Sequence, residues 1–323
     1  MQIHRGLPHF KSGPRRILTT GTFDGVHLGH QALLSWMVDR AREEEAESVV
    51  LTFHPHPRQV LFGDNSGLSL LQSLDQRARE LERCGLDHLV IQPFDRDFAR
   101  LRPEEFVKTV LVEGLGCTTV VVGHDHRFGA GREGDVDLLR DCGDTFGFDV
   151  VHIPAHIEDE LTVSSTKVRQ RLGEGDCAGA AALLGRPHAW AGRVVHGDGR
   201  GRTLGYPTAN LSALEPQQML PDAGVYAARI QNPDSSTPSH WNGMVHIGHR
   251  PTFDPDDQPP TVEVHLFDAD GPDLYGQTLE VQFIARLRGT EKFDGADALQ
   301  AQLKRDEMAA REALAHRNPS GLR

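Results

Sequence analysis

The chain has 323 residues, of which 38% are hydrophobic and 25% are charged. This length is typical of about two domains, and the composition is typical of a globular protein with adequate hydrophobic cores. The formal net charge of −12 disfavours nonspecific binding to nucleic acid or to an anionic membrane, because the overall field repels both.

We expect neither a secretory leader nor a membrane-spanning segment. Residues 1–16 contain no apolar core of a signal peptide, and no later run approaches the ~20 apolar residues that a bilayer span needs. The cysteines show no CxxC spacing, which disfavours a disulfide framework or a thiolate zinc site: they are Cys84, Cys117, Cys142 and Cys177. We therefore expect a cytoplasmic protein with reduced cysteines.

The stretch GTFDGVHLGH, residues 21–30, lies between a short apolar run and a helix-like segment. A strand that enters a helix through a glycine-bounded loop presents backbone N–H groups and the positive helix end to anionic oxygens. His27 and His30 are three residues apart, so both imidazoles can lie on one side and donate hydrogen bonds to phosphate. Asp24 would repel phosphate, so it indicates either bound Mg²⁺ or a structural hydrogen-bonding role.

Apolar runs alternate with helical segments through the first half of the chain. We predict strands at 47–53, 87–91, 118–122 and 148–153, and helices at 73–83 and 102–112. This alternation predicts a parallel, doubly wound α/β sheet, which binds ligands at the carboxyl ends of its strands. The prolines of residues 54–57 predict a rigid loop there, because they interrupt both strand and helix.

Polar residues follow several of these strands. They occur in GTFDGVHLGH, in HPHP at 54–57 and in GHDHRFG at 123–129. In a further segment, 163–169, serine or threonine caps a predicted helix on which Arg169 can reach a polyphosphate. Loops carrying His, Asp, Ser and Arg at one sheet edge indicate a nucleotide site.

The pattern changes at a domain boundary that we place between residues 184 and 185. Short strands with glycine and proline turns follow at 189–196, 224–230, 242–247, 261–267 and 279–285, which predicts a small closed barrel. Residues 297–315 predict one or two amphipathic helices packed outside the barrel, and residues 319–323 should be frayed.

Two features of the second half carry chemistry. The loop GDGRGR, residues 197–202, suits close backbone approach to phosphate. Thr208 and Asn210 follow it, share one face of an extended segment and supply oxygens that suit Mg²⁺. In the strand at 261–267, Glu263 lies on the face opposite Val262 and Val264, so it is either an exposed carboxylate or an internal base.

These motifs resemble those of the bacterial bifunctional riboflavin kinase/FAD synthetase family. In the first half the resemblance rests on GTFDGVHLGH, TFHPHP, GHDHRFG and SSTKVR; in the second it rests on LLGRP, GRTLGYPTANL, GVYAARI, IGHRPTF, VEVHLFDAD, DLYG and EKF. It covers residues 21 to about 306 in order. It implies a Rossmann-like FMN adenylyltransferase domain at 1–184 and a β-barrel riboflavin kinase domain at 185–323, with riboflavin, FMN and ATP as small-molecule partners and FAD as product.

The resemblance also implies roles for individual residues. Glu263 would be the general base of the kinase, Thr208 and Asn210 would bind Mg²⁺ with ATP, and the second reaction would use His27, His30 and Arg169. The implied nucleotide- and flavin-binding residues of the first half are Gly21, Phe23, Asp24, Gly29, Gly123, Asp125, Arg127, Ser164, Ser165 and Thr166. Those of the second half are Gly201, Arg202, Tyr275, Arg288 and Glu291.

Three positions depart from the family pattern. His126 stands where phenylalanine is usual, and Ala130 stands where lysine is common, so the stacking or phosphate contact of this loop is altered. Tyr206 replaces a frequent phenylalanine and keeps an aromatic plane.

Three other functions stay open at this point. The HxGH loop alone does not name the acceptor, so adenylyl transfer to another phosphate monoester or acid is an alternative. A flavin-binding regulator that keeps the fold without turnover is a second one. Histidine pairs such as His54/His56, His124/His126 and His152/His156 suggest transition-metal binding, but no third ligand is evident for any pair.

Overall fold

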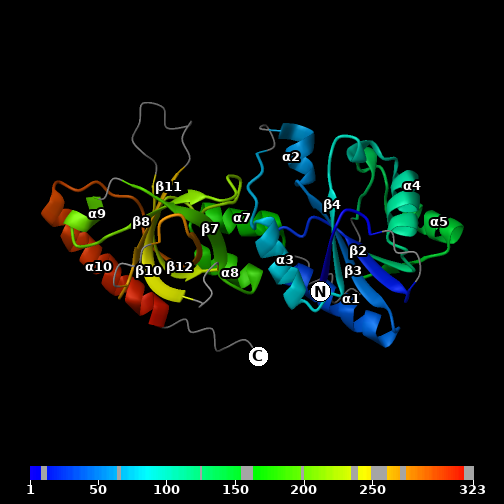
Figure 1. Cartoon of the computed structure of the whole chain (residues 1–323), viewed down its shortest axis with the longest axis horizontal. Coiled ribbons are helices and arrows are strands. Elements are labelled where there is room, and N and C mark those ends of the chain that lie inside the picture. The colour runs from blue at the N-terminus through cyan, green and yellow to red at the C-terminus, as the bar shows by residue number, and fades with distance from the viewer. Residues whose placement is uncertain are drawn as a thin grey trace. The chain divides into compact units, whose positions relative to one another are not determined.

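The computed structural model describes residues 1–8, 13–63, 67–123, 126–153, 163–197, 200–233, 239–248, 260–269 and 274–315. By its contacts the chain forms two compact units (Figure 1). The N-terminal unit comprises Met1–Leu68 and Ser73–Ser164, and the C-terminal unit comprises Ser69–Gln72 and Ser165–Arg323.

A parallel six-stranded sheet forms the centre of the N-terminal unit. Its order is β1-β4-β3-β2-β5-β6, and every pair of neighbours is parallel. The strands are β1 (Gln2–Arg5), β2 (Arg16–Thr20), β3 (Glu47–His54), β4 (His88–Pro93), β5 (Thr119–Val122) and β6 (Asp149–His152). The predicted parallel sheet is confirmed, and β1 is an additional strand that the sequence pattern did not indicate.

Alternate residues of the sheet enter two separate hydrophobic cores. Val49, Leu51 and Val90 pack into one core, whereas Val50 and Leu89 pack into the other. Because side chains of a strand alternate between faces, both faces of the sheet are covered. The described helices are α1 (Leu28–Glu43), α2 (Pro57–Phe62), α3 (Leu74–Arg83), α4 (Pro103–Phe106), a π-helix (Val107–Gly114) and α5 (Val136–Phe146), with 3₁₀ turns at Phe98–Arg100 and Ala130–Arg132. The doubly wound architecture is therefore confirmed.

Helix α2 corrects the prediction of a rigid loop after β3. Pro57 occupies the first helical turn, where its missing N–H group leaves no hydrogen bond unmade. The His56 side chain accepts a hydrogen bond from the Arg58 amide, and the Gln59 side chain accepts one from the His56 amide. These prolines therefore begin a helix where we expected a loop. Helix α5 was also not predicted.

A closed antiparallel barrel forms the centre of the C-terminal unit. Its order is β10-β11-β8-β7-β12-β9, and the interior is filled by large side chains such as Trp190, Tyr226 and Phe283. The strands are β7 (His188–Val195), β8 (Ala209–Ala213), β9 (Gly224–Asn232), β10 (Ser239–Gly248), β11 (Thr261–Leu266) and β12 (Thr278–Arg288). The predicted closed barrel is confirmed.

Four helices described in this unit accompany the barrel: α7 (Ser165–Gly173), α8 (Cys177–Leu184), α9 (Arg200–Thr203) and α10 (Ala296–Ala315). Ala310 and Leu314 of α10 pack with Ala227, Met244 and Ile284 outside the barrel, as the amphipathic pattern predicts. Although α7 and α8 group with the barrel by contact, the folding boundary between 184 and 185 stays a prediction. Residues 319–323 lie outside the described residues.

Candidate active sites

A strained loop connects β2 to α1 in the N-terminal unit. Phe23, Gly25 and Val26 all have positive φ angles, at 48°, 91° and 37°. Such angles are unfavourable for residues with a Cβ atom, and here the buried side chains of Phe23 and Val26 hold them in place. We call residues 21–25 the phosphate loop, because it delivers the chain to the N-terminus of α1, whose first turn contains the buried Gly29.

His27 and His30 lie against each other at the start of α1. Their ring centroids are 3.7 Å apart and their planes differ by 15°. Nδ1 of His27 accepts a hydrogen bond of 3.3 Å from the His30 amide, which leaves Nε2 of a neutral His27 to carry its proton. Desolvation, and then the neighbouring His27, hold the pKa of His30 well below its usual value. The pair therefore presents neutral imidazoles.

Asp24 is buried and interacts electrostatically with a buried cation, Arg77. Asp24 is 3% exposed and Arg77 is 6% exposed. Burial lowers the pKa of Arg77, and the nearby Asp24 carboxylate opposes that shift. Of the two roles that the sequence left open for Asp24, this arrangement favours the structural one over Mg²⁺ binding.

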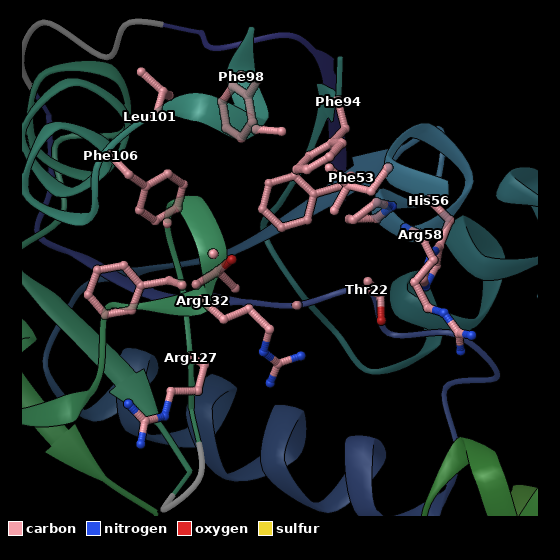
Figure 2. Close-up of a pocket in the computed structure, with 18 of the residues that line it drawn as sticks. Thr22, Phe53, His56, Arg58, Phe94, Phe98, Leu101, Phe106, Arg127 and Arg132 are labelled. Atoms are coloured by element: carbon pink, nitrogen blue, oxygen red, sulfur yellow. Dashed lines mark hydrogen bonds between the residues drawn. The ribbon is translucent and has the colours of Figure 1, made fainter. Parts of the chain in front are cut away.

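A cavity of about 770 Å³ opens beside the phosphate loop (Figure 2). The loops after β2, β3 and β5 line it with Gly21, Thr22, His56, His126 and Arg127. One side is aromatic: Phe53, Phe94, Phe98 and Phe106 form a chain of ring contacts with centroids 5.6–6.1 Å apart. Arg58, Arg127 and Arg132 also line the cavity, which thus combines flat apolar walls with guanidinium groups.

Sequence reasoning missed the aromatic wall. In a sequence, a phenylalanine next to a strand is usually interpreted as a core residue. Only its position after the end of a strand could have indicated a binding site. Phe94 directly follows β4, and Phe98 begins the 3₁₀ helix Phe98–Arg100 that comes next, at the ligand edge of the sheet.

The two departures in the loop after β5 have visible consequences. The His126 ring lies 6.0 Å from Phe128 and still lines the cavity. Close to Ala130, which cannot supply the common lysine charge, Arg132 lines the cavity instead. Arg127 also pairs with Asp135 at 3.3 Å. Gly123 directly follows β5, and Asp125 lies outside the described residues.

The SSTKVR segment begins α7. Ser164 ends the N-terminal unit, whereas Ser165, Thr166 and Arg169 belong to the C-terminal unit. Nε of Arg169 donates a hydrogen bond of 2.6 Å to the Ser69 carbonyl. Participation of this segment in the nucleotide site stays a prediction.

The glycine-rich loop of the C-terminal unit lies directly on Thr208 and Asn210. A Cβ atom on Gly201 would collide with the Tyr206 carbonyl and approach Thr208, and one on Gly197 would collide with the Asn210 amide. Only glycine permits this approach. The threonine hydroxyl and asparagine amide supply hard oxygens beneath a phosphate-type loop, so these residues fit Mg²⁺.

Glu263 joins this group through strand pairing. It lies opposite Asn210 in the β11–β8 ladder, and Thr208 Oγ1 donates a hydrogen bond of 3.2 Å to its Oε2. Val262 and Val264 fill the barrel interior, so half-buried Glu263 lies on the outer face. His246 lies opposite it on β10; burial lowers the pKa of His246, and Glu263 opposes that shift. His246 was missed because a lone strand histidine carries no signal.

A smaller cavity of about 150 Å³ is lined by Arg202, Thr208 and Tyr275. Tyr275 stacks on His196 with ring centroids 4.0 Å apart. Arg288 does not line it but forms an ion pair with Asp306 of α10 at 2.8 Å, and Glu291 is exposed beyond β12. The structure thus gathers Arg202, Thr208, Asn210, Tyr275 and Glu263 but does not bring Arg288 or Glu291 into the cavity lining.

Among the described residues, no group of three or more His, Cys, Asp and Glu side chains is arranged to hold a metal ion. His124 and His156 lie outside that part of the chain. The described residues therefore give no support to a transition-metal site. Nor is any helix in them long and apolar enough to cross a membrane.

Comparisons with known proteins cover nearly the whole chain. A family model described as FAD synthetase matches residues 10–167, and one described as riboflavin kinase matches residues 184–314. Relatives named bifunctional riboflavin kinase/FMN adenylyltransferase include those of Escherichia coli K12 (39% identity, 99% of this chain, 100% of the relative), Haemophilus influenzae (36%, 96%, 98%) and Bacillus subtilis (33%, 95%, 96%).

A solved structure is similar over the same extent. The crystal structure of a protein described as a macrolide-efflux protein from Streptococcus pneumoniae is 31% identical, with a TM-score of 0.81, over 96% of this chain and 98% of that one. The likeness supports the order of a parallel-sheet unit followed by a barrel.

Proposed function

The chain belongs to the bifunctional riboflavin kinase/FMN adenylyltransferase family and carries both activities, and we propose which of its residues perform each reaction. Riboflavin is phosphorylated by ATP to FMN, and FMN then receives an adenylyl group from ATP to give FAD and pyrophosphate. The proposal assigns the first reaction to the barrel and the second to the parallel sheet.

In the kinase reaction, Glu263 is the general base. It accepts the proton of the 5′-hydroxyl of the ribityl chain as that oxygen attacks the γ-phosphorus of ATP and ADP leaves. The single observation that supports this assignment most strongly is the hydrogen bond from Thr208 to Glu263, with Asn210 paired opposite. Thr208 and Asn210 would hold Mg²⁺, which neutralises phosphate charge when bound. A hydroxyl can donate a hydrogen bond to a carboxylate and at the same time offer an oxygen lone pair to a cation. Thr208 therefore orients Glu263 beside the nucleotide.

In the adenylyl transfer, no base is needed because the FMN phosphate is already an anion. One of its oxygens attacks the α-phosphorus of ATP, and pyrophosphate leaves. His27 and His30, as neutral N–H donors at the start of α1, stabilise the charge that develops on the phosphate oxygens. We assign the flavin ring to the aromatic wall of the large cavity and the FMN phosphate to its arginines.

A time course with riboflavin, ATP and Mg²⁺ tests the assignment. Wild type should make FMN and then FAD; Glu263→Ala should lose the first step but convert supplied FMN, and His30→Ala should stop at FMN. Accumulation of FMN without FAD in wild type would point to another acceptor and to the altered loop at His126 and Ala130. Absence of both products would favour a flavin-binding regulator.

We also place the enzyme in the cytoplasm, because both reactions consume ATP and all four cysteines are free thiols, as that compartment maintains them.

A further inference from the structure

Two side chains anchor the Thr22 carbonyl of the phosphate loop. Nη1 of Arg77 donates a hydrogen bond of 2.6 Å to it, and Thr52 Oγ1 donates one of 3.3 Å. The neighbouring Gly21 amide is bonded to the Leu51 carbonyl at 3.0 Å. Arg77 comes from α3, a helix whose own residues do not line the large cavity. A helix that lies far along the sequence therefore fixes the backbone just before the left-handed residue Phe23.

Arg77 and Asp24 also depend on each other electrostatically. Nε of Arg77 is buried and has no hydrogen-bond partner within the described residues, so hydrogen bonds alone do not offset the desolvation of this cation. The Asp24 carboxylate opposes the fall in the pKa of Arg77 that burial causes. Conversely, the Arg77 charge attracts the buried Asp24 carboxylate, which lies in a loop that we assign to polyphosphate.

We propose that Arg77 is a positioning residue for adenylyl transfer: it fixes the Thr22 carbonyl and neutralises Asp24, so that the phosphate loop keeps the shape and charge that ATP requires. This inference rests on the proposed adenylyl transfer at the N-terminal unit. Because Arg77 acts through the loop, it touches no substrate. Gly21 and Thr22 of the loop line one side of the large cavity, but the aromatic wall and the arginines assigned to FMN come from other segments. Loss of Arg77 therefore weakens the interaction with ATP much more than the interaction with FMN.

The test uses the full chain and FMN adenylylation with separate titrations of ATP and FMN. Arg77→Met should raise KM for ATP about tenfold, the size of one hydrogen bond to a charged group, and change KM for FMN less than about twofold. Arg77→Lys keeps the charge but not the planar fork, so it should recover more than half of the loss on a logarithmic scale, but not all of it.

Asp24→Asn added to Arg77→Met separates charge from structure. Removing the carboxylate charge that Arg77 no longer attracts should restore kcat/KM for ATP about threefold or more relative to Arg77→Met alone. If Arg77 only stabilises the fold, kcat/KM for ATP should fall further in the double variant. Arg79→Met is the matched control, because it changes an exposed arginine of the same helix and should leave both KM values unchanged.

Each result supports or overturns the inference separately from the proposed function. If wild type forms no FAD, the adenylyl transfer itself fails. If wild type forms FAD but Arg77→Met leaves KM for ATP unchanged, or raises both KM values equally, the positioning role is wrong. If Arg77→Met unfolds the N-terminal unit while riboflavin phosphorylation persists, Arg77→Lys decides in the same way: a raised KM for ATP alone supports the role, and no change in it overturns the role.

Discussion

Thr208 Oγ1 donates a 3.2 Å hydrogen bond to Oε2 of Glu263, so a residue of the segment before β8 orients a carboxylate on β11. Glu263→Gln keeps the size of the side chain and removes its ability to accept a proton. Riboflavin phosphorylation should fall by roughly 10²- to 10⁴-fold, the usual contribution of a general base. The measurement is the initial rate of FMN formation.

Two controls make that result specific. The same variant, supplied with FMN, should make FAD at the wild-type rate. Glu312→Gln changes an exposed carboxylate of α10 in the same unit and should affect neither step. A Glu263→Gln enzyme that phosphorylates riboflavin at a wild-type rate would remove Glu263 from the role of base.

The Mg²⁺ assignment predicts a difference between two substitutions at one position. Thr208→Val keeps the shape and removes the hydroxyl, so the Mg²⁺ concentration for half-maximal kinase activity should rise about 10- to 100-fold. Thr208→Ser keeps the hydroxyl and should stay close to wild type. Kinase assays across a Mg²⁺ titration at saturating ATP measure this, and equal behaviour of the two variants would argue against a metal-binding hydroxyl.

The aromatic wall predicts a separation of the two flavin sites. Phe98→Leu keeps an apolar side chain but removes the ring, so KM for FMN in adenylyl transfer should rise about tenfold if the ring stacks on the flavin. KM for riboflavin in the kinase reaction should not change. If only the KM for riboflavin rises, or if neither KM changes, the cavity of Figure 2 is not the site that binds the flavin of FMN.

The sequence predicted those parts of the fold that depend on local pattern. Buried runs such as 49–51 identified the sheet, and the alternation around Glu263 correctly separated it from Val262 and Val264. It did not predict α2, because proline breaks the interior of a helix but is favoured in the first turn, where Pro57 lies. The sequence also did not show which face of β11 points out of the barrel, because this depends on how the barrel closes.

The partner of Asp24 lies beyond any local pattern. Arg77 lies 53 positions after Asp24 (77 − 24) in the sequence. In the sequence it resembles an ordinary helix residue, and only the folded structure brings its side chain to the loop. The same holds for Phe94 and Phe98, whose rings become a cavity wall only when the loops after neighbouring strands converge. The sequence therefore predicted chemistry within one segment and the sheet edge at which several loops meet, but not the individual contacts between distant segments.

Acid should destabilise the barrel through His188. This side chain is 2% exposed, and Nε2 donates a hydrogen bond of 2.8 Å to the Met219 carbonyl. Desolvation lowers its pKa from 6.5 to about 4, opposed by the Met219 carbonyl and assisted by Arg186. Between these two values the unfolded chain binds the proton and the folded chain does not. The contribution of His188 to the free energy of unfolding is therefore fully present above pH 6.5. It decreases as the pH drops toward 4, by roughly 3 kcal/mol in total.

Tryptophan fluorescence can isolate this effect. The chain has three tryptophans, of which Trp190 and Trp241 lie in the barrel, so a Trp36→Phe background reports on the C-terminal unit. In urea unfolding, His188→Gln should keep a donor for the Met219 carbonyl and lose most of the fall in stability between pH 6.5 and 4, because glutamine does not titrate. His240→Gln, at an exposed strand position, should keep the wild-type pH dependence. An acid sensitivity that persists in His188→Gln would assign it to other groups, because no proton could then be entering at residue 188.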